Sequence, residues 1–163
     1  MVYGVVIAYG FNFIDQASTP SHYFRFFFSY LIVTIDWIYV HNLYWGWEYK
    51  YNSFLVFDLG ILFTISRLLH SSTAQDSHYL LFLAILFILY FGWDTFSRDK
   101  KMPTEYDWRY SLFGDLFAGI TYLALWYLSL RGLIGNGLFL NLVIVVIYFI
   151  AFASWFKKSS KKI

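Results

Sequence analysis

The sequence predicts an all-α fold, a polytopic integral membrane helix bundle with about five transmembrane helices, within a range of about four to six. The composition is the first reason, because 60% of the 163 residues are hydrophobic and only 13% are charged. A soluble domain is about half apolar and one quarter charged. The mean hydropathy of +0.55 and the 25% of aromatic residues agree with this, since lipid accepts Phe while Tyr and Trp suit both interfaces.

The second reason is a series of apolar runs, each close to the roughly 20 residues that cross a bilayer as a helix. The second and third runs are short and should extend into flanking residues. The runs make up a predicted bundle at residues 23–156, which a basic cytoplasmic tail at residues 157–163 follows, and no internal repeat is evident. We expect transmembrane helices at Tyr23–Leu43, Phe54–Leu69, Tyr79–Trp93, Ser111–Leu130 and Gly137–Phe156.

Residues 1–22 form a separate N-terminal apolar segment. Residues 1–14 would rise only about 21 Å as a helix, and Gly4 and Gly10 weaken a helix there. The segment lacks the positive start and the small-residue cleavage site of a signal peptide. We therefore expect a re-entrant or interfacial segment that stays attached to the bundle, with a thin sixth span as the alternative.

Basic residues predict which side of the bundle faces the cytoplasm. If successive loops alternate between two sides, nine of the twelve Lys and Arg residues fall in the 44–53 loop, the 97–110 loop and the C-terminal tail, all on one side. Cytoplasmic loops are rich in Lys and Arg, so the pattern predicts an integral protein of the plasma (inner) membrane with a cytoplasmic C-terminus. Arg25, Arg67 and Arg131 fall on the other side, near helix ends where they can snorkel to the interface.

Four aspartates lie on four different predicted helices, and all of them fall in the cytoplasmic half of the bundle: Asp36, Asp58, Asp94 and Asp115. A charged side chain at the centre of a transmembrane helix costs about 2.5 to 3.5 kcal/mol on the insertion scale, so such residues usually face the bundle interior or a wet cavity. We therefore expect these carboxylates to lie close to one another at one depth.

Asp36 is the strongest candidate for a role in ion movement, because it lies deepest, about 10 Å from its helix end at 1.5 Å per residue. His41 follows on the same helix and adds a second polar group to its inner third. Around Asp115, Gly114 and Gly119 form a small-residue face that lets another helix approach closely. These features predict an ion pathway that uses Asp36, Asp58, Asp115 and His41.

Each of the shallower acids also has a structural interpretation. We interpret Asp94 as a hydrated residue at the membrane boundary that pairs with Arg98 four positions later. Asp58 and Asp115 lie in the first turns of their helices, where a carboxylate complements the positive end of the helix macrodipole. The sequence leaves packing and function about equally favoured for these two acids.

We expect a small homo-oligomeric membrane protein that forms, or contributes to, a cation- or proton-conducting pathway through its intramembrane acids, since rings of acids make pores cation-selective. The alternative is a non-catalytic sensor or anchoring subunit, whose basic loop and tail contact anionic lipid or an acidic cytosolic or membrane protein. We expect no enzyme activity, cofactor, metal site or nucleic-acid binding, because the chain has no cysteine and no recognisable catalytic, phosphate-binding or metal motif. The basic residues of the alternative are Arg98, Lys100, Lys101, Arg109, Lys157 and Lys158.

Overall fold

The structure is a computed structural model of the 163-residue chain, and it describes residues 2–44, 52–74, 78–97, 108–135 and 137–155. These residues form six α-helices and one 3-10 helix, with no strand among them. The predicted all-α class is therefore confirmed. The elements are α1 (Val2–Gly10), η1 (Phe11–Gln16), α2 (Pro20–Tyr44), α3 (Asn52–Thr73), α4 (His78–Ser97), α5 (Trp108–Leu130) and α6 (Leu138–Trp155).

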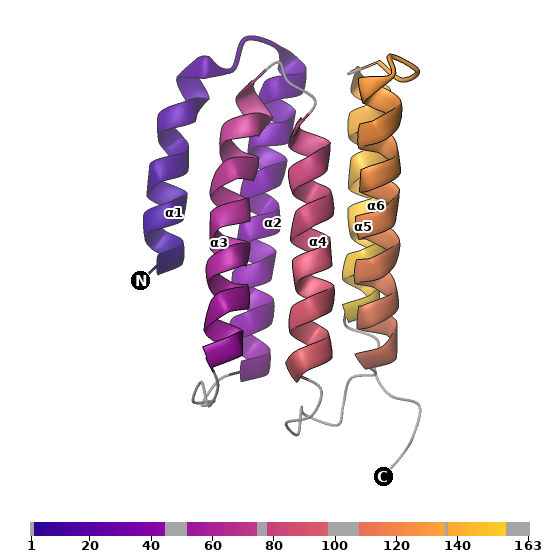
Figure 1. The fold of residues 1–163 in the computed structure, drawn as a ribbon. Coiled ribbons are helices and arrows are strands. Elements are labelled where there is room, and N and C mark those ends of the chain that lie inside the picture. The colour runs from indigo at the N-terminus through magenta and orange to yellow at the C-terminus, as the bar shows by residue number, and fades with distance from the viewer. Residues whose placement is uncertain (1, 45–51, 75–77, 98–107, 136, 156–163) are drawn as a thin grey trace.

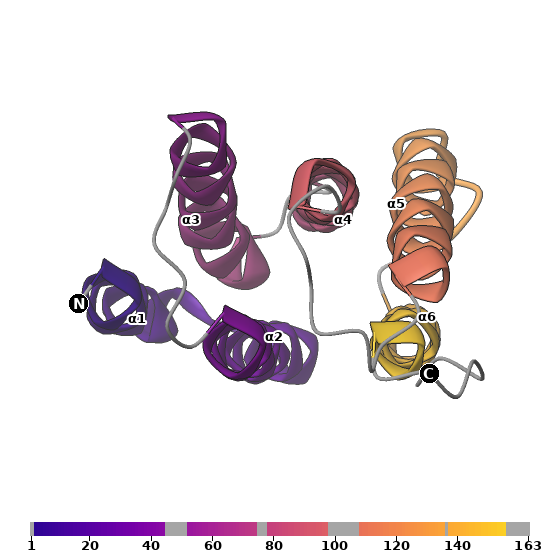
Figure 2. The ribbon, with the colours of Figure 1, turned by 90° about the horizontal axis from the view of Figure 1, so that it is seen from below.

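Helices α2 to α6 coincide with the five apolar runs of the sequence and form an up-and-down bundle (Figure 1). The short runs are extended as expected, because α3 continues to Thr73 and α4 continues to Ser97. Seen along the bundle, α4 lies between α3 and α5, while α2 and α6 lie on the other side (Figure 2). Here the "acidic end" is the end at which α2, α4 and α6 terminate, and the "opposite end" is the end at which they begin (Figure 1).

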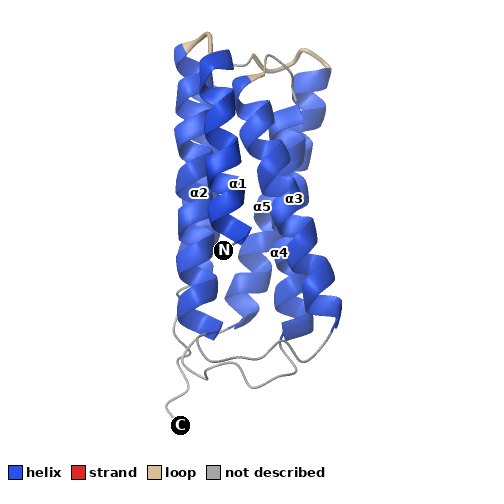
Figure 3. Ribbon diagram, turned by 90° about the vertical axis from the view of Figure 1, so that its left-hand side faces the viewer, coloured by secondary structure: helices blue, strands red, loops and turns tan. Residues whose placement is uncertain are grey.

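The N-terminal segment is helical and packs against α2 and α3 at the opposite end of the bundle. Helix α1 and η1 together stop short of the acidic end (Figure 3). Gly10 lies at their junction, where an added Cβ would lie 2.6 Å from the Tyr30 hydroxyl and 2.7 Å from Leu69 Cδ1. The glycine thus lets the segment approach both helices closely. The length of the N-terminal segment fits a segment that does not cross the membrane. Whether it enters a membrane stays a prediction.

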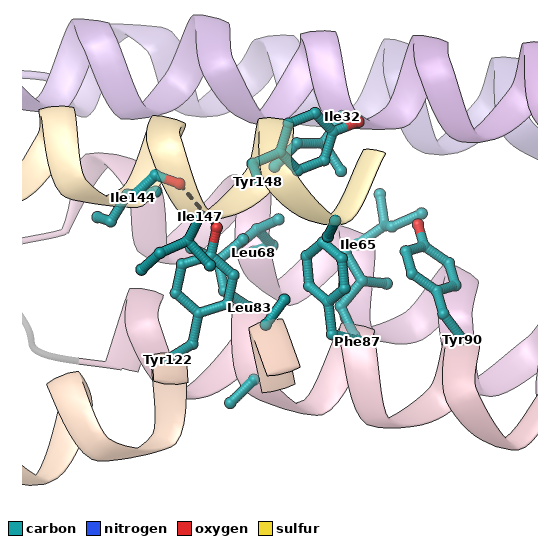
Figure 4. Packing of buried hydrophobic residues seen from close by; sticks show 14 of the residues in the cluster. Ile32, Ile65, Leu68, Leu83, Phe87, Tyr90, Tyr122, Ile144, Ile147 and Tyr148 are labelled. Atoms are coloured by element: carbon teal, nitrogen blue, oxygen red, sulfur yellow. Dashed lines mark hydrogen bonds between the residues drawn. The ribbon is translucent and has the colours of Figure 1, made fainter. Parts of the chain in front are cut away.

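Each bundle helix turns one stripe of side chains toward the centre. On α5 the stripe is Ser111, Asp115, Ala118 and Tyr122, spaced at four, three and four residues and at most 4% exposed, as expected for one face of a helix. Large side chains from α2 to α6 interlock in the middle of the bundle (Figure 4). Ser111 and Asp115 lie toward one end of the bundle and Arg25 and Asn141 toward the other, with the apolar and aromatic layer between them.

Among the described residues, three helices are long and apolar enough to cross a membrane: His78–Phe96, Arg109–Leu130 and Leu138–Trp155. They belong to α4, α5 and α6. Helices α2 and α3 are not among them, and each carries one arginine and one aspartate within its apolar run. The membrane character of the chain is therefore supported by three helices rather than by five.

Candidate functional site

Three aspartates from three helices are buried at the acidic end, and we call them the acidic cluster: Asp36 of α2, Asp94 of α4 and Asp115 of α5. Their exposed fractions are 3%, 7% and 1%. Asp115 lies within electrostatic range of both other acids. The structure thus brings together three of the four aspartates that were expected to lie close to one another, and one of the three is Asp94, which was expected at a hydrated boundary.

One carboxylate oxygen of Asp115 accepts a short hydrogen bond, and the other accepts none from the described residues. The Trp155 Nε1–H donates to Asp115 Oδ1 at 2.7 Å across the α5–α6 interface. The other oxygen, Oδ2, is buried and accepts no hydrogen bond from the part of the chain that the structure describes. The helices approach closely just before this contact, because an added Cβ at Gly114 would lie 3.2 Å from the Ala151 carbonyl oxygen and would overlap Ser154. The predicted small-residue face is therefore present.

Asp94 joins the cluster through α5. The Ser111 hydroxyl donates to Asp94 Oδ2. Ser111 lies one turn before Asp115 on the same face of α5, so that helix presents both a hydroxyl and a carboxylate to the cluster. The burial of Asp94 departs from the sequence interpretation because Ser111, which is distant in sequence, replaces solvent as its partner. Arg98, the expected partner, lies outside the described residues.

Asp58 lies on α3, is only half-buried, and is held by a contact of the same kind. The Trp93 Nε1–H donates to Asp58 Oδ1 at 3.1 Å. Here too a glycine stands beside the contact, because an added Cβ at Gly92 would lie 2.5 Å from Phe57 Cε1. In each of the hairpins α3–α4 and α5–α6, a Trp near the end of the second helix therefore holds an Asp near the start of the first.

The two hairpins also share a short sequence pattern. Each aspartate is followed directly by leucine and, six positions on, by a threonine. Thr64 and Thr121 both donate to the carbonyl oxygen four residues back, at 2.8 and 2.7 Å. The similarity is confined to these few positions, which is why the sequence shows no evident repeat.

Aromatic rings close the cluster off from the middle of the bundle. The Trp155 ring meets the Tyr90 ring edge-on, with centroids 5.5 Å apart, and lies 6.2 Å from the Phe87 ring. Phe87 in turn lies 6.1 Å from Tyr148. These side chains are all at most 6% exposed. The acids are therefore screened from the apolar layer by aromatic faces and edges.

A second polar group lies at the opposite end, and sequence reasoning missed it. Arg25 is only 4% exposed, whereas its place near a helix end had suggested snorkelling. Its Nε–H donates to Asn141 Oδ1 of α6 at 2.9 Å, and Asn141 Nδ2–H donates to the Ser21 hydroxyl at 2.8 Å. The guanidinium also lies over the Tyr79 ring, 5.4 Å from its centroid. The one available signal was Asn141, a lone amide in a long apolar run.

Of the other residues expected to have a role, several lie outside the part of the chain that the structure describes. Helix α2 contains His41, but its side chain lies outside the described residues, as do Arg98, Lys100, Lys101, Lys157 and Lys158. Arg109 is exposed at the start of α5. Arg67 and Arg131 are exposed near the opposite end and lie over Phe82 and Tyr127. Within the described ranges, no group of three or more His, Cys, Asp or Glu residues could hold a metal ion.

Fold and site together define a helical protein with membrane-length helices and a buried carboxylate cluster at one end. Comparison of the chain with protein-family models, curated proteins and solved structures gives no match. Chemically, the cluster offers carboxylate oxygens that can bind positive charge, together with indole and hydroxyl donors that fix their orientation.

Proposed function

We propose that this chain is a small integral membrane protein whose acidic cluster forms part of a cation- or proton-conducting pathway. One observation carries the proposal: Asp115 Oδ2 is buried, lacks a hydrogen-bond donor among the described residues, and lies within range of two further acids. An ionised carboxylate in such a place is costly. Bound positive charge offsets this cost, so the cluster favours uptake of a cation.

In this proposal α2 and α3 cross the membrane together with α4, α5 and α6, which gives five spans. At 1.5 Å per residue, α2 and α3 are about 37 and 33 Å long, enough for a hydrocarbon core of about 30 Å. Both pack in the same bundle as α4 to α6. Large apolar side chains on α5 and α6 are exposed, including Phe113 at 68% and Phe139 at 80%, which suits contact with lipid. The basic loops and tail support a cytoplasmic acidic end in a plasma membrane.

Oligomerisation is part of the proposal. Within one copy, the layer around Phe87 and Tyr148 is closely packed, and both side chains are fully buried. A hydrated pore is therefore easier to build between copies, where repeated acids would line a ring. The exposed apolar faces of α5 and α6 suit lipid or a second copy equally.

The alternative is a non-catalytic subunit that docks a partner protein or anionic lipid through its basic loop and tail. The exposed position of Arg109 at the start of α5 agrees with such a role. A docking subunit needs no buried carboxylate cluster, however, and its own basic residues would be sufficient. We therefore rank it second.

Ion flux into liposomes that contain only this protein tests the proposal. We expect flux in the parent protein, and a marked loss in Asp36→Asn and in Asp115→Asn, because Asn keeps the shape of Asp but not its charge. The matched control is Asp15→Asn, since Asp15 is exposed in η1 at the opposite end and should leave flux unchanged. Absence of flux in the parent protein would refute the pathway and favour the docking alternative.

A further inference from the structure

We propose that the contact between α5 and α6 at the acidic end is a gate whose position depends on the charge of Asp115. While positive charge neutralises Asp115, α6 lies against α5 as in the structure, and the gate is closed. When Asp115 is ionised, the Trp155 end of α6 moves away from α5, and the gate is open. The inference rests on the proposed function and adds the regulation of that same site.

The surroundings of Asp115 suit a neutral side chain better than an ionised one. The residue is 1% exposed, and the Trp155 Nε1–H donates to Oδ1 at 2.7 Å. Oδ2 is buried and accepts no hydrogen bond from any described residue. One hydrogen bond offsets only part of the cost of burying an ionised carboxylate. Neutral Asp115 therefore favours the closed gate, and ionised Asp115 favours an arrangement that water can reach.

The other acids of the cluster act in the same sense. Asp36 and Asp94 lie within electrostatic range of Asp115, and negative charge on either one repels negative charge on Asp115. Tyrosine side chains are neutral in water below about pH 9, so the acids dominate the charge of the described part of this region. The titratable side chains packed around Asp115 and its Trp155 partner from α2, α4 and α6 are Asp36, Asp94, Tyr90 and Tyr148.

Helix α6 is attached differently at its two ends. Near the opposite end, Asn141 bonds to Arg25 and to Ser21 of α2, at 2.9 and 2.8 Å. These three side chains do not change charge near neutral pH. At the acidic end, Trp155 of α6 bonds to a carboxylate, whose charge can change. A change of charge on Asp115 therefore acts on one end of α6 while the other end stays attached.

Small residues form the α5–α6 contact next to Asp115. An added Cβ at Gly114 would lie 3.2 Å from the Ala151 carbonyl oxygen and 3.0 Å from Ser154 Cβ. Gly, Ala and Ser carry little apolar surface, so little burial is lost at these positions when the helices separate. Helices α5 and α6 lie together at one side of the bundle (Figure 2). An open gate would let acids that are buried within each copy reach a pathway between copies.

A small movement of α6 is sufficient to open the gate. The helix has 18 residues and is about 27 Å long at 1.5 Å per residue. A tilt of about 10° about its attached end moves the Trp155 end by about 5 Å. Movement of a packed helix about a few terminal residues is a common form of conformational change.

Pulsed EPR measures the position of the gate. Nitroxide labels on Val56→Cys of α3 and Ala153→Cys of α6, both exposed, report the distance across the acidic end in a chain without other cysteines. An excess of unlabelled protein in the liposomes keeps each measured pair within one copy. The probe is the proton, because it neutralises carboxylates whichever cation the pathway carries. In the parent protein we expect the distance to lengthen by about 5 Å between about pH 5 and about pH 9.

Two aspartate variants identify the group that moves the gate. Asp115→Asn keeps the acceptor for Trp155 without the charge, so it should give the shorter distance at both pH values. The matched control is Asp58→Asn, which removes charge from the similar contact with Trp93. Asp58 is only half-buried, so this variant should lengthen as the parent does. An unchanged distance in a parent protein that conducts ions would overturn the gate and leave the proposed function intact, and lengthening that persists in Asp115→Asn would overturn the role of Asp115.

A disulfide between α5 and α6 tests whether the gate controls flux. The variant Gly114→Cys with Ser154→Cys brings two Cβ atoms about 3.0 Å apart, close to the roughly 3.5 to 4.5 Å of a disulfide. We expect oxidation to lower ion flux at least about tenfold and a reductant to restore it. Gel filtration and circular dichroism establish folding, and the EPR measurement does not depend on this variant. Equal flux in the oxidised and reduced forms would overturn the gate, whereas absence of flux from the parent protein would refute the proposed function.

Discussion

Replacing Trp155 by Phe should destabilise the bundle by removing the one hydrogen-bond donor to Asp115 among the described residues. The hydrogen bond is 2.7 Å long and joins α5 to α6 in a place where both residues are at most 4% exposed. Leaving a buried acceptor unsatisfied costs about 1 to 3 kcal/mol, although interhelical hydrogen bonds in membranes average only about 0.6 and reach about 1.7 kcal/mol. The smaller ring buries roughly 40 Å² less apolar surface, which adds about 1 kcal/mol. We expect a total loss of about 2 to 3 kcal/mol in the free energy of unfolding.

Another tryptophan of the chain serves as a matched control for the smaller size of the Phe ring. Trp126 is half-buried on α5, and its Nε1–H donates to no described acceptor. Trp126→Phe therefore loses ring area without losing a hydrogen bond, and it should cost only about 1 kcal/mol. Trp93→Phe should fall between the two, because its acceptor Asp58 is half-buried and water can replace the lost donor.

A double-mutant cycle isolates the hydrogen bond from the ring. Unfolding in detergent by increasing SDS, followed by circular dichroism, gives the stabilities of the parent protein, Trp155→Phe, Asp115→Leu and the double variant. We expect a coupling energy of about 1 kcal/mol, within the range for membrane hydrogen bonds. Independent sites add to within about 0.3 kcal/mol. A coupling energy below that value would show that the contact does not hold α5 to α6.

Three further predictions follow from the packing and the charge pattern. Gly114→Val should cost about 1 to 3 kcal/mol in the same unfolding assay, because its side chain would meet α6 near Ala151; unchanged stability would contradict the close approach. Asn141→Leu removes the acceptor of Arg25 Nε and should cost about 1.5 to 3 kcal/mol, whereas Asn141→Asp, which keeps an acceptor, should cost less. Cysteines introduced at positions 101 and 161, in a chain that has none, should not react with an impermeant thiol reagent added outside intact cells. Labelling of either cysteine would contradict the predicted cytoplasmic position of the loop and the tail.

The helices could be predicted from the sequence because the length and hydropathy of each apolar run are local properties. Each of the five apolar runs is a helix in the structure. The meeting of Asp36 and Asp115 also followed, since alternating helices place residues of similar depth at one end and a buried charge avoids lipid. Small residues beside Asp115 then indicated which face of α5 meets another helix.

Contacts between particular helices were not predictable in the same way. A helix that is apolar on every side has no amphipathic stripe to say which face turns inward, and α6 is of this kind apart from Asn141 near its start and Ser154 near its end. The sequence therefore gave no reason to join Trp155 to Asp115, or Arg25 to Asn141. Asp94 was misjudged for a related reason, because its partner Ser111 lies on another helix.

The burial of Arg25 bears on how the two ends of the bundle work together. In the proposed pathway the acidic cluster attracts positive charge, whereas the cation fixed at the opposite end by Asn141 and Tyr79 repels it. The same repulsion would oppose entry of a metal cation from that side. Within one copy, the closely packed aromatic layer therefore separates a buried cation at one end of the bundle from the buried acids at the other, which agrees with a pathway built between copies.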